Sequence, residues 1–420
     1  YVYGDDGRKF IDAGMAPASA ALGHCHPKVV EAVRRQIGAL HFVHGARFTS
    51  PPLEALAEKL ISRAPDGLAR TYFSLSGSDA VEAAIKLARQ YFIESGQPQR
   101  TRFIGRRHEY HGATVGALSM GGNGYRRRMA QGMLLDVPLL STPYVYRYRQ
   151  PQESDAQYVS RLGGELDGEI RTLGAHNVAA FVAETVNGTT LGAVPPVPGY
   201  FRHIREVCDR HGVLLILDEV LCGIGYTGTM HACEQEGVVP DLLPIGKGLG
   251  AGHQPISGVL VHERIVNAIM TGSGGFNHGQ TYEGHAVGCA AALAVQEVIE
   301  EENLLAAVTE RGRRLDQLLR ERLGTHPNVG DIRGRGLLRA TEFVVDRDTK
   351  KPFDPARKIA HRIREAAASR GMLCFGGGGD LDGAGDHIMI TPPFIVPDAM
   401  LETIVGILGE AVDEVLPAAA

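Results

Sequence analysis

Short, uninterrupted apolar stretches alternate with helical patterns in the middle of the chain, and this alternation limits the fold more than any other feature. Residues 178–182 and 213–217 are apolar throughout and are flanked by polar or turn residues. Such stretches are typical of strands buried on both faces of a parallel sheet. Helical periodicity occupies other segments, as at 80–92 and 199–211. The pattern therefore predicts an α/β domain with a mainly parallel central sheet.

The character of the chain changes after about residue 290. Helical patterns there are followed by two strand-like segments and a last amphipathic helix, over residues 290–301, 304–323, 337–345, 387–391 and 398–415. We therefore expect a large domain over residues 46–295 and a smaller α+β domain over residues 296–420. Residues 1–45 are expected to pack with the small domain or with a partner. Gly376 to Gly379 predict a mobile or tightly turning loop.

Composition argues against several classes of function. A net charge of -5 at pH 7 gives no reason to expect a nucleic-acid partner. The chain has no run of about 18 uninterrupted apolar residues, so a membrane span is not expected. The six cysteines are scattered, without a Cys-x-x-Cys pair, which favours free thiols in a reducing cytoplasm. No signal peptide opens the chain, and because it begins with Tyr1 in a strand-like segment, we expect an N-terminal piece to be missing.

Two motifs carry the main chemical signal. Asp218 and Glu219 stand at the C-terminal end of a predicted buried strand, the edge at which open α/β sheets bind ligands. A carboxylate there needs a cation or hydrogen-bond donors. Lys247 lies among glycines and apolar residues, which lower the pKa of a lysine and make it a better nucleophile. Taken alone, each motif has a simpler interpretation: the two acids could merely cap the strand, and the lysine could lie at the surface of a flexible loop.

Three weaker motifs accompany this pair. Residues 76–78, Ser-Gly-Ser, precede the predicted helix at 80–92 and suit either a phosphate site or simple helix capping. Tyr110, followed by His and Gly, suits a ring stacked on a flat cofactor, although a packed tyrosine is the alternative. Thr281, in a polar cluster before an Ala-rich helix, has a hydroxyl that could bind a phosphate.

The order and spacing of these motifs resemble the class III aminotransferases, the ω-aminotransferase group of the fold-type I enzymes that use pyridoxal 5′-phosphate (PLP). The resemblance covers essentially the whole chain and is most specific between residues 217–220, Leu-Asp-Glu-Val, and 246–248, Gly-Lys-Gly. It implies that Lys247 forms a Schiff base with PLP and acts as general base, and that Asp218 keeps the pyridine nitrogen protonated.

The same resemblance implies the remaining cofactor contacts: a phosphate-binding turn, a residue on each face of the ring, an acid near the ring hydroxyl, and a threonine that serves the neighbouring subunit. The matching residues are Ser76, Gly77, Ser78, Tyr110, His111, Glu184, Val220 and Thr281. The implied reaction moves an amino group from an amine or ω-amino acid to a keto acid such as pyruvate, by a ping-pong mechanism. A homodimer or higher homo-oligomer with shared active sites is implied as well.

Two departures from the family pattern concern arginines. Tyr226 stands where the family often has arginine, which puts local packing or subunit contacts in doubt. The loop at 376–386 lacks the arginine that binds the substrate carboxylate in many relatives. It holds Asp380, Asp382 and Asp386 instead, which favours a cationic or neutral amine donor. Candidates for carboxylate binding are Arg47 and the basic run Arg126 to Arg128, although this run could instead form a solvated face. Candidates for the substrate pocket are Phe42, His44, Phe48 and Phe394.

Other functions remain open at this stage. A PLP-dependent aminomutase, epimerase, racemase or decarboxylase could share the fold. Gly223, Gly225 and Gly228 match the Gly-x-Gly-x-x-Gly pattern of an NAD-dependent oxidoreductase. A scaffold without catalytic activity is a further class. Histidines at 24 and 26, 41 and 44, and 108 and 111 could suggest a metal, but turn and loop positions are the preferred interpretation, so no metal is expected.

Overall fold

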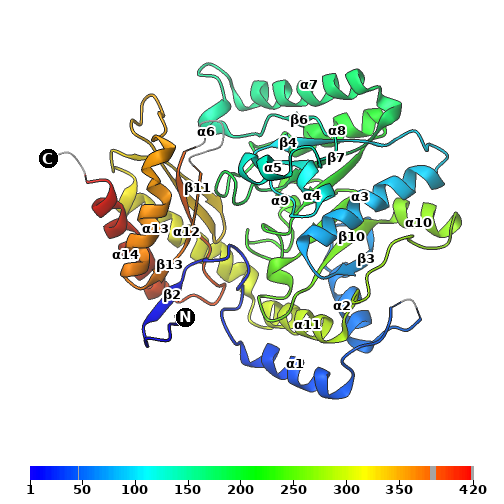
Figure 1. Cartoon of the computed structure of the whole chain (residues 1–420), viewed down its shortest axis with the longest axis horizontal. Coiled ribbons are helices and arrows are strands. Elements are labelled where there is room, and N and C mark those ends of the chain that lie inside the picture. Colours follow the sequence, from blue (N-terminus) through cyan, green and yellow to red (C-terminus); the bar gives the residue numbers. More distant parts are fainter. Residues whose placement is uncertain (46, 379–384, 418–420) are drawn as a thin grey trace.

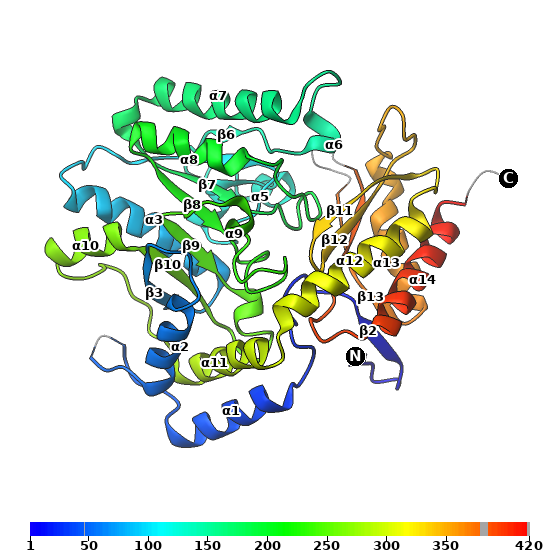
Figure 2. The same cartoon turned by 180° about the vertical axis from the view of Figure 1, so that it is seen from behind.

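The computed structural model describes residues 1–45, 47–378 and 385–417. A larger and a smaller sheet, each with its own helices, lie at opposite ends of the molecule (Figures 1 and 2). The boundaries at residues 45 and 295 stay predictions. Among the described residues, no helix combines the length and apolar character needed to cross a membrane.

The larger sheet has eight strands and is mostly parallel, which confirms the predicted fold class. Its strand order is β3-β10-β9-β8-β7-β4-β5, with β6 also paired to β4. Strand β10 runs antiparallel to both of its neighbours. The bounds are β3 Leu68–Ser74, β4 Arg102–Arg107, β5 Gly121–Gly122, β6 Leu139–Leu140, β7 Val178–Glu184, β8 Leu214–Asp218, β9 Leu242–Ile245 and β10 Ser257–His262.

Strands β7 and β8 are buried on both faces, as their continuous apolar sequences predict. Alternate side chains enter two different cores, because successive side chains of a strand point to opposite faces. Phe181 and Leu215 join the core that includes helices α7 (Asp155–Leu173) and α8 (Tyr200–His211). Val182 and Ile216 join the core that includes α3 (Gly77–Glu94) and α10 (Glu263–Thr271).

The smaller sheet is antiparallel, with strand order β11-β12-β15-β14. Three helices of the C-terminal region pack beside it (Figure 1). The helices predicted at 304–323 and 398–415 are confirmed with the same ends. The bounds are β11 Val329–Arg335, β12 Leu338–Phe343, β14 Phe375–Gly377, β15 His387–Ile390, α12 Leu304–Leu323, α13 Ile359–Ser369 and α14 Asp398–Val415.

The glycine run at 376–379 differs in part from its prediction as a loop. Gly376 and Gly377 belong to β14 and pair with Ile388 and His387 of β15. A Cβ on Gly377 would lie 2.9 Å from the His387 ring, so close packing rather than flexibility explains this glycine. Gly378 has φ +95°, a left-handed backbone conformation that favours glycine. Gly379 lies outside the described residues.

A third, three-stranded sheet joins the N-terminal segment to the C-terminal region. Strand β2 (Lys9–Asp12) pairs antiparallel with β1 (Val2–Tyr3) and parallel with β13 (Met372–Leu373). The remaining helices include α1, which packs against α11, and three short 3-10 turns. Their bounds are α1 Pro27–Ala39, α2 Pro51–Ile61, α4 Val115–Met120, α5 Gly124–Ala130, α6 Val145–Tyr148, α9 Cys233–Glu236, α11 Ala286–Glu301, η1 Ala175–Asn177, η2 Lys247–Leu249 and η3 Pro355–Arg357.

Candidate active site

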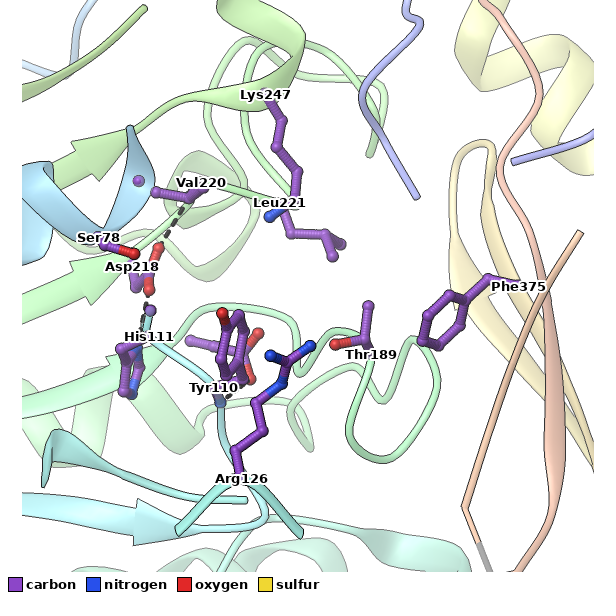
Figure 3. Close-up of a pocket in the computed structure, with 13 residues that line it drawn as sticks. Ser78, Tyr110, His111, Arg126, Thr189, Asp218, Val220, Leu221, Lys247 and Phe375 are labelled. Atoms are coloured by element: carbon purple, nitrogen blue, oxygen red, sulfur yellow. Dashed lines mark hydrogen bonds and ion pairs between the residues drawn. The ribbon is translucent and has the colours of Figure 1, made fainter. Parts of the chain in front are cut away.

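A cavity of about 350 Å³ opens where β7, β8 and β9 end. This is the edge of a parallel sheet at which ligands are expected. Figure 3 shows Lys247 and Asp218 on the same cavity, although they come from different strand ends. Eight of the ten predicted cofactor residues line it: Gly77, Ser78, Tyr110, His111, Glu184, Asp218, Val220 and Lys247.

Asp218 is the last residue of β8, and its carboxylate is buried and fully engaged. Its Oδ2 lies 2.7 Å from Nδ1 of His111, and its Oδ1 accepts a hydrogen bond of 2.9 Å from the backbone N–H of Val220. Burial opposes a charge on the His111 ring, but hydrogen bonds with Asp218 and Glu109 outweigh it and raise the pKa of His111 to about 10. At neutral pH His111 is therefore an imidazolium paired with the Asp218 carboxylate.

The charge pairing continues below His111. Nε2 of His111 lies 3.5 Å from Oε2 of Glu109, which is completely buried. The guanidinium of Arg106 donates to Oε1 of Glu109 from Nε at 2.8 Å and to the carbonyl of Glu184 at 2.5 Å. Burial disfavours the Glu109 carboxylate, but Arg106 and His111 lower its pKa below the ordinary value. Asp218, His111, Glu109 and Arg106 thus form a row of alternating charges beneath the cavity.

Glu184 ends β7 directly beside Asp218 in the strand register. Its carboxylate accepts backbone N–H groups of Gly188 at 3.0 Å and Tyr110 at 3.4 Å, and the side-chain amide of Asn187 at 3.2 Å. Burial, with the nearby charge of Glu109, raises the pKa of Glu184. This acid therefore tends toward its neutral form.

The second acid of the Asp-Glu pair has a structural role. Glu219 points away from the cavity and accepts the backbone N–H groups of Ala232 and Cys233, both at 2.7 Å, and the hydroxyl of Thr185 at 3.0 Å. Burial raises its pKa to about 7. These bonds hold the turns after β8 together, so the two neighbouring acids serve different purposes.

Lys247 follows β9 after a single glycine. Its φ of +39° is unusual for a residue with a side chain. A Cβ on the preceding Gly246 would lie 3.2 Å from Cγ1 of Val220, which shows how closely the backbone passes the cavity wall. Burial lowers the pKa of Lys247, while the charges of Asp218 and Glu184 work in the opposite direction. A lysine with a depressed pKa can serve as nucleophile and base.

The N-terminus of α3 borders the cavity through Gly77 and Ser78. A Cβ on Gly77 would lie 2.6 Å from Cγ1 of Val220, so this position needs a glycine. Gly112, with φ +146°, packs just as closely against Ser78, whose Oγ accepts the backbone N–H of Ala113 at 3.0 Å. Backbone N–H groups at the start of an 18-residue helix suit a phosphate.

Ser76 does not line the cavity. Its exposed side chain caps α3, since Oγ accepts the backbone N–H of Asp79 at 3.2 Å and donates to the Asp79 carboxylate at 2.9 Å. Thr281 is also exposed and outside the cavity of its own chain, so its service to a neighbouring subunit stays a prediction.

Five further residues line the cavity. The Arg126 guanidinium lies 4.7 Å from the centre of the Tyr110 ring. Figure 3 shows the two side chains next to each other. Sequence reasoning gave Arg126 as a carboxylate candidate only together with the other arginines of the basic run, without separating the three. It did not identify the other four, which come from turns and from the smaller sheet: Gly112, Thr189, Leu221 and Phe375. Phe375 carried no local signal, because only packing of the smaller sheet brings it to the cavity.

The candidate substrate residues mostly lie elsewhere. Phe394 is completely buried and packs edge-to-face on Tyr226, with ring centres 4.6 Å apart, so its prediction as a pocket residue is wrong. Phe48 and Arg47 are exposed and outside the cavity. Phe42 contacts the ring of Tyr282 at 5.6 Å between ring centres. His44 does not line the cavity either.

The acidic loop also differs from its prediction. Asp386 is buried, and its Oδ1 accepts the backbone N–H of Ala360 at 3.1 Å in the first turn of α13. It therefore does not face a donor in the cavity. Asp380 and Asp382 lie outside the described residues. No group of three or more histidines, cysteines or acids within residues 1–45, 47–378 and 385–417 is placed to hold a metal ion.

Comparison with known families decides the class. The model of the family described as aminotransferase class-III matches residues 1–412. The chain belongs to the class-III aminotransferases. A relative from Schizosaccharomyces pombe, named an uncharacterized aminotransferase, is 41% identical over 420 residues, which cover 100% of this chain and 92% of the relative.

Solved structures of class-III aminotransferases agree closely with this fold. A thermostable omega transaminase mutant from Pseudomonas jessenii has a TM-score of 0.92 at 32% identity, covering 99% of this chain and 91% of that one. The PMP-bound form of an aminotransferase from Vibrio fluvialis has a TM-score of 0.93 at 30% identity, covering 100% and 92%. Such likeness over whole chains shows a PLP-dependent enzyme of fold type I.

The cavity of this class-III aminotransferase fits PLP. The α3 N-terminus offers N–H donors to a phosphate, and the buried Asp218 carboxylate can meet a protonated ring nitrogen. The glycines at 77 and 112 leave no room for a Cβ, as close backbone approach to a ligand requires.

The rival NAD pattern has a packing role instead. Gly225 has φ +96°, and a Cβ there would lie 2.9 Å from Leu305 and 3.1 Å from Phe394. The next helix is the four-residue α9, so the glycines do not open a long helix as an NAD-binding turn does. Tyr226, the departure from the family arginine, is buried among these contacts, and burial raises its pKa.

Proposed function

We propose that this enzyme transfers an amino group from an amine or ω-amino acid to a keto acid such as pyruvate, in two half-reactions at Lys247. The observation that carries the proposal is the placement of Lys247 on one cavity with the Asp218 carboxylate, which pairs with His111. Likeness to a structure described as an omega transaminase supports the choice of donor class. A homodimer is part of the proposal, because Thr281 is exposed outside its own cavity.

The residues around the cavity divide the work of holding PLP. Gly77 and Ser78 would hold the phosphate, Asp218 would meet the ring nitrogen, and Lys247 would bond the aldehyde carbon. Val220 and Tyr110 would cover the two faces of the ring, and Glu184 would lie on the hydroxyl side. When bound, PLP supplies a ring that accepts electrons from the substrate carbon bearing nitrogen.

Proton transfer falls to Lys247. Because its pKa is lowered, its Nζ is available without a proton once it is released from the cofactor. It accepts the proton from the substrate carbon that bears nitrogen and gives a proton back later in the half-reaction. The His111 imidazolium pairs with Asp218 and orients its carboxylate, which would face the ring nitrogen of PLP.

A half-reaction experiment tests the proposal. The holoenzyme is mixed with a diamine, an ω-amino acid or 1-phenylethylamine, without an acceptor. We expect at least one donor to convert the bound cofactor into its amine form, seen as a change in visible absorbance, with one equivalent of carbonyl product. Added pyruvate should then restore the spectrum and yield alanine. If substrates are isomerised while the cofactor spectrum recovers without an acceptor, the enzyme is an aminomutase or epimerase instead.

A further inference from the structure

The three arginines of the basic run have three different environments. Arg127 donates to the carbonyls of Leu118, Ser119 and Gly121 at 3.1, 3.1 and 2.8 Å, which closes the end of α4. Arg128 lies 5.8 Å from the centre of the exposed Tyr125 ring. Arg126 alone of the three lines the cavity. The run is therefore not a uniform solvated face.

Arg126 has no carboxylate partner among the described residues, unlike His111 on the same cavity. His111 is matched by Asp218 and Glu109. The Arg126 guanidinium instead lies over the Tyr110 ring, and in Figure 3 it is between Tyr110 and Thr189. An anion that enters the cavity therefore meets Arg126 as a cation whose charge is not already neutralised.

The chemistry of the guanidinium selects the ligand. Its planar fork of N–H donors matches a carboxylate in two parallel hydrogen bonds, and stacking on an aromatic ring leaves its edges available. The phosphate of PLP has its own donors at the α3 N-terminus, beside Ser78. A second anion is thus expected at Arg126, and the substrates of the proposed reaction supply one.

We propose that Arg126 binds the carboxylate of the substrate, so that the best donors and acceptors of this enzyme carry a carboxylate. The inference rests on the proposed function, because it assigns the substrate class of the same cavity. Arg126 is then a specificity-determining residue. It takes the place of the arginine that the sequence of the loop at 376–386 lacks.

The test compares substrates with and without a carboxylate in the Arg126→Gln holoenzyme. The donor pair is β-alanine and n-propylamine, and the acceptor pair is pyruvate and propanal. Loss of a charge-assisted contact should lower kcat/KM for β-alanine and pyruvate by about 10- to 100-fold. The values for n-propylamine and propanal should change less than about 2-fold. The two pairs show separately whether the contact serves the donor, the acceptor or both.

A binding measurement provides a readout independent of turnover. Propionate, which carries no amine or carbonyl to react, should bind the wild-type holoenzyme in calorimetry and bind the Arg126→Gln holoenzyme at least about 10-fold more weakly. Arg126→Lys should retain part of the affinity, because it keeps the charge but loses the fork. Arg128→Gln is the matched control and should behave like wild type.

Two outcomes overturn the inference. One is an equal loss for all four substrates, which would give Arg126 a role in holding Tyr110 or the cofactor. The other is no selective loss for either carboxylate. If none of the tested donors converts the cofactor of the wild-type enzyme, the proposed function fails. A wild-type enzyme that transaminates normally, with no selective effect of Arg126→Gln, contradicts only the inference.

Discussion

The floor of the cavity and its mouth differ in how their charges are paired. On the floor, Asp218, His111, Glu109 and Arg106 are buried and each charge faces one of the opposite sign. At the mouth, Arg126 is exposed and lies on an aromatic ring. A neutralised, buried floor is preorganised before any ligand arrives, which is how electrostatic catalysis works. The mouth is instead completed by the ligand, so it is the part that can change specificity.

Replacement of Lys247 should give the largest effect. Lys247→Ala removes both the covalent attachment and the base, so we expect kcat to fall by at least about 10⁴-fold. The floor is untouched, so PLP should still bind noncovalently, which equilibrium dialysis can measure. The exposed Lys351→Ala is the control. Turnover near the wild-type level in Lys247→Ala would refute the assignment.

Replacement of Asp218 tests whether the floor works through charge. Asp218→Asn keeps the size of the side chain but removes the charge that meets the ring nitrogen. We expect kcat to fall by about 10² to 10³-fold, as when one preorganised electrostatic partner is lost. The pKa of His111 should fall at the same time, because its main partner is gone. NMR titration of His111 can follow this change, and an unaltered pKa would contradict the charge row.

The pH dependence of stability sharpens the same point. The folded-state pKa of His111 is raised from 6.5 to about 10. Its charge therefore stabilises the fold fully below about pH 6.5, and this stabilisation is lost as the pH rises through about 10. For protein freed of cofactor, the urea midpoint of wild type should exceed that of His111→Gln more at about pH 6 than at about pH 10.5. A constant difference would mean that His111 is not charged in the fold.

Ser76 should give the smallest effect. Because its hydroxyl caps α3, Ser76→Ala should lower the free energy of unfolding by about 1 kcal/mol. PLP affinity and kcat should change little, since Ser76 does not line the cavity. Denaturant unfolding and dialysis measure the two quantities. If the loss of PLP binding free energy exceeded the loss in the free energy of unfolding, Ser76 would have to contact the cofactor.

The site residues at the strand ends could be predicted from sequence, whereas Glu109 and Arg106 of the floor and the placement of the mouth residues could not, for a physical reason. Glu184, Asp218 and Lys247 lie at or just after the ends of buried strands, and the apolar stretches before them reveal those strands. The carboxyl ends of parallel strands share one edge of a sheet, so these side chains converge without further information.

Residues of the mouth and of the core depend on packing between distant segments. Phe375 reaches the cavity only because the smaller sheet docks there. Phe394 does not line the cavity, because it packs against the ring of Tyr226 instead. Arg126 sits in a basic run whose three members look alike in sequence and separate only when α5 is placed beside Tyr110.

The pairing of β2 with β13 has a consequence for synthesis of the protein. Ile11 lies opposite Met372, so the N-terminal strand keeps an unpaired edge until hundreds of later residues have been made. At about 5–20 residues per second, that interval is on the order of 20–70 seconds on a ribosome. The larger sheet lies entirely between these two strands and can fold in the meantime. The three-stranded sheet can form only afterwards, and it then ties the first strands of the chain to its C-terminal region.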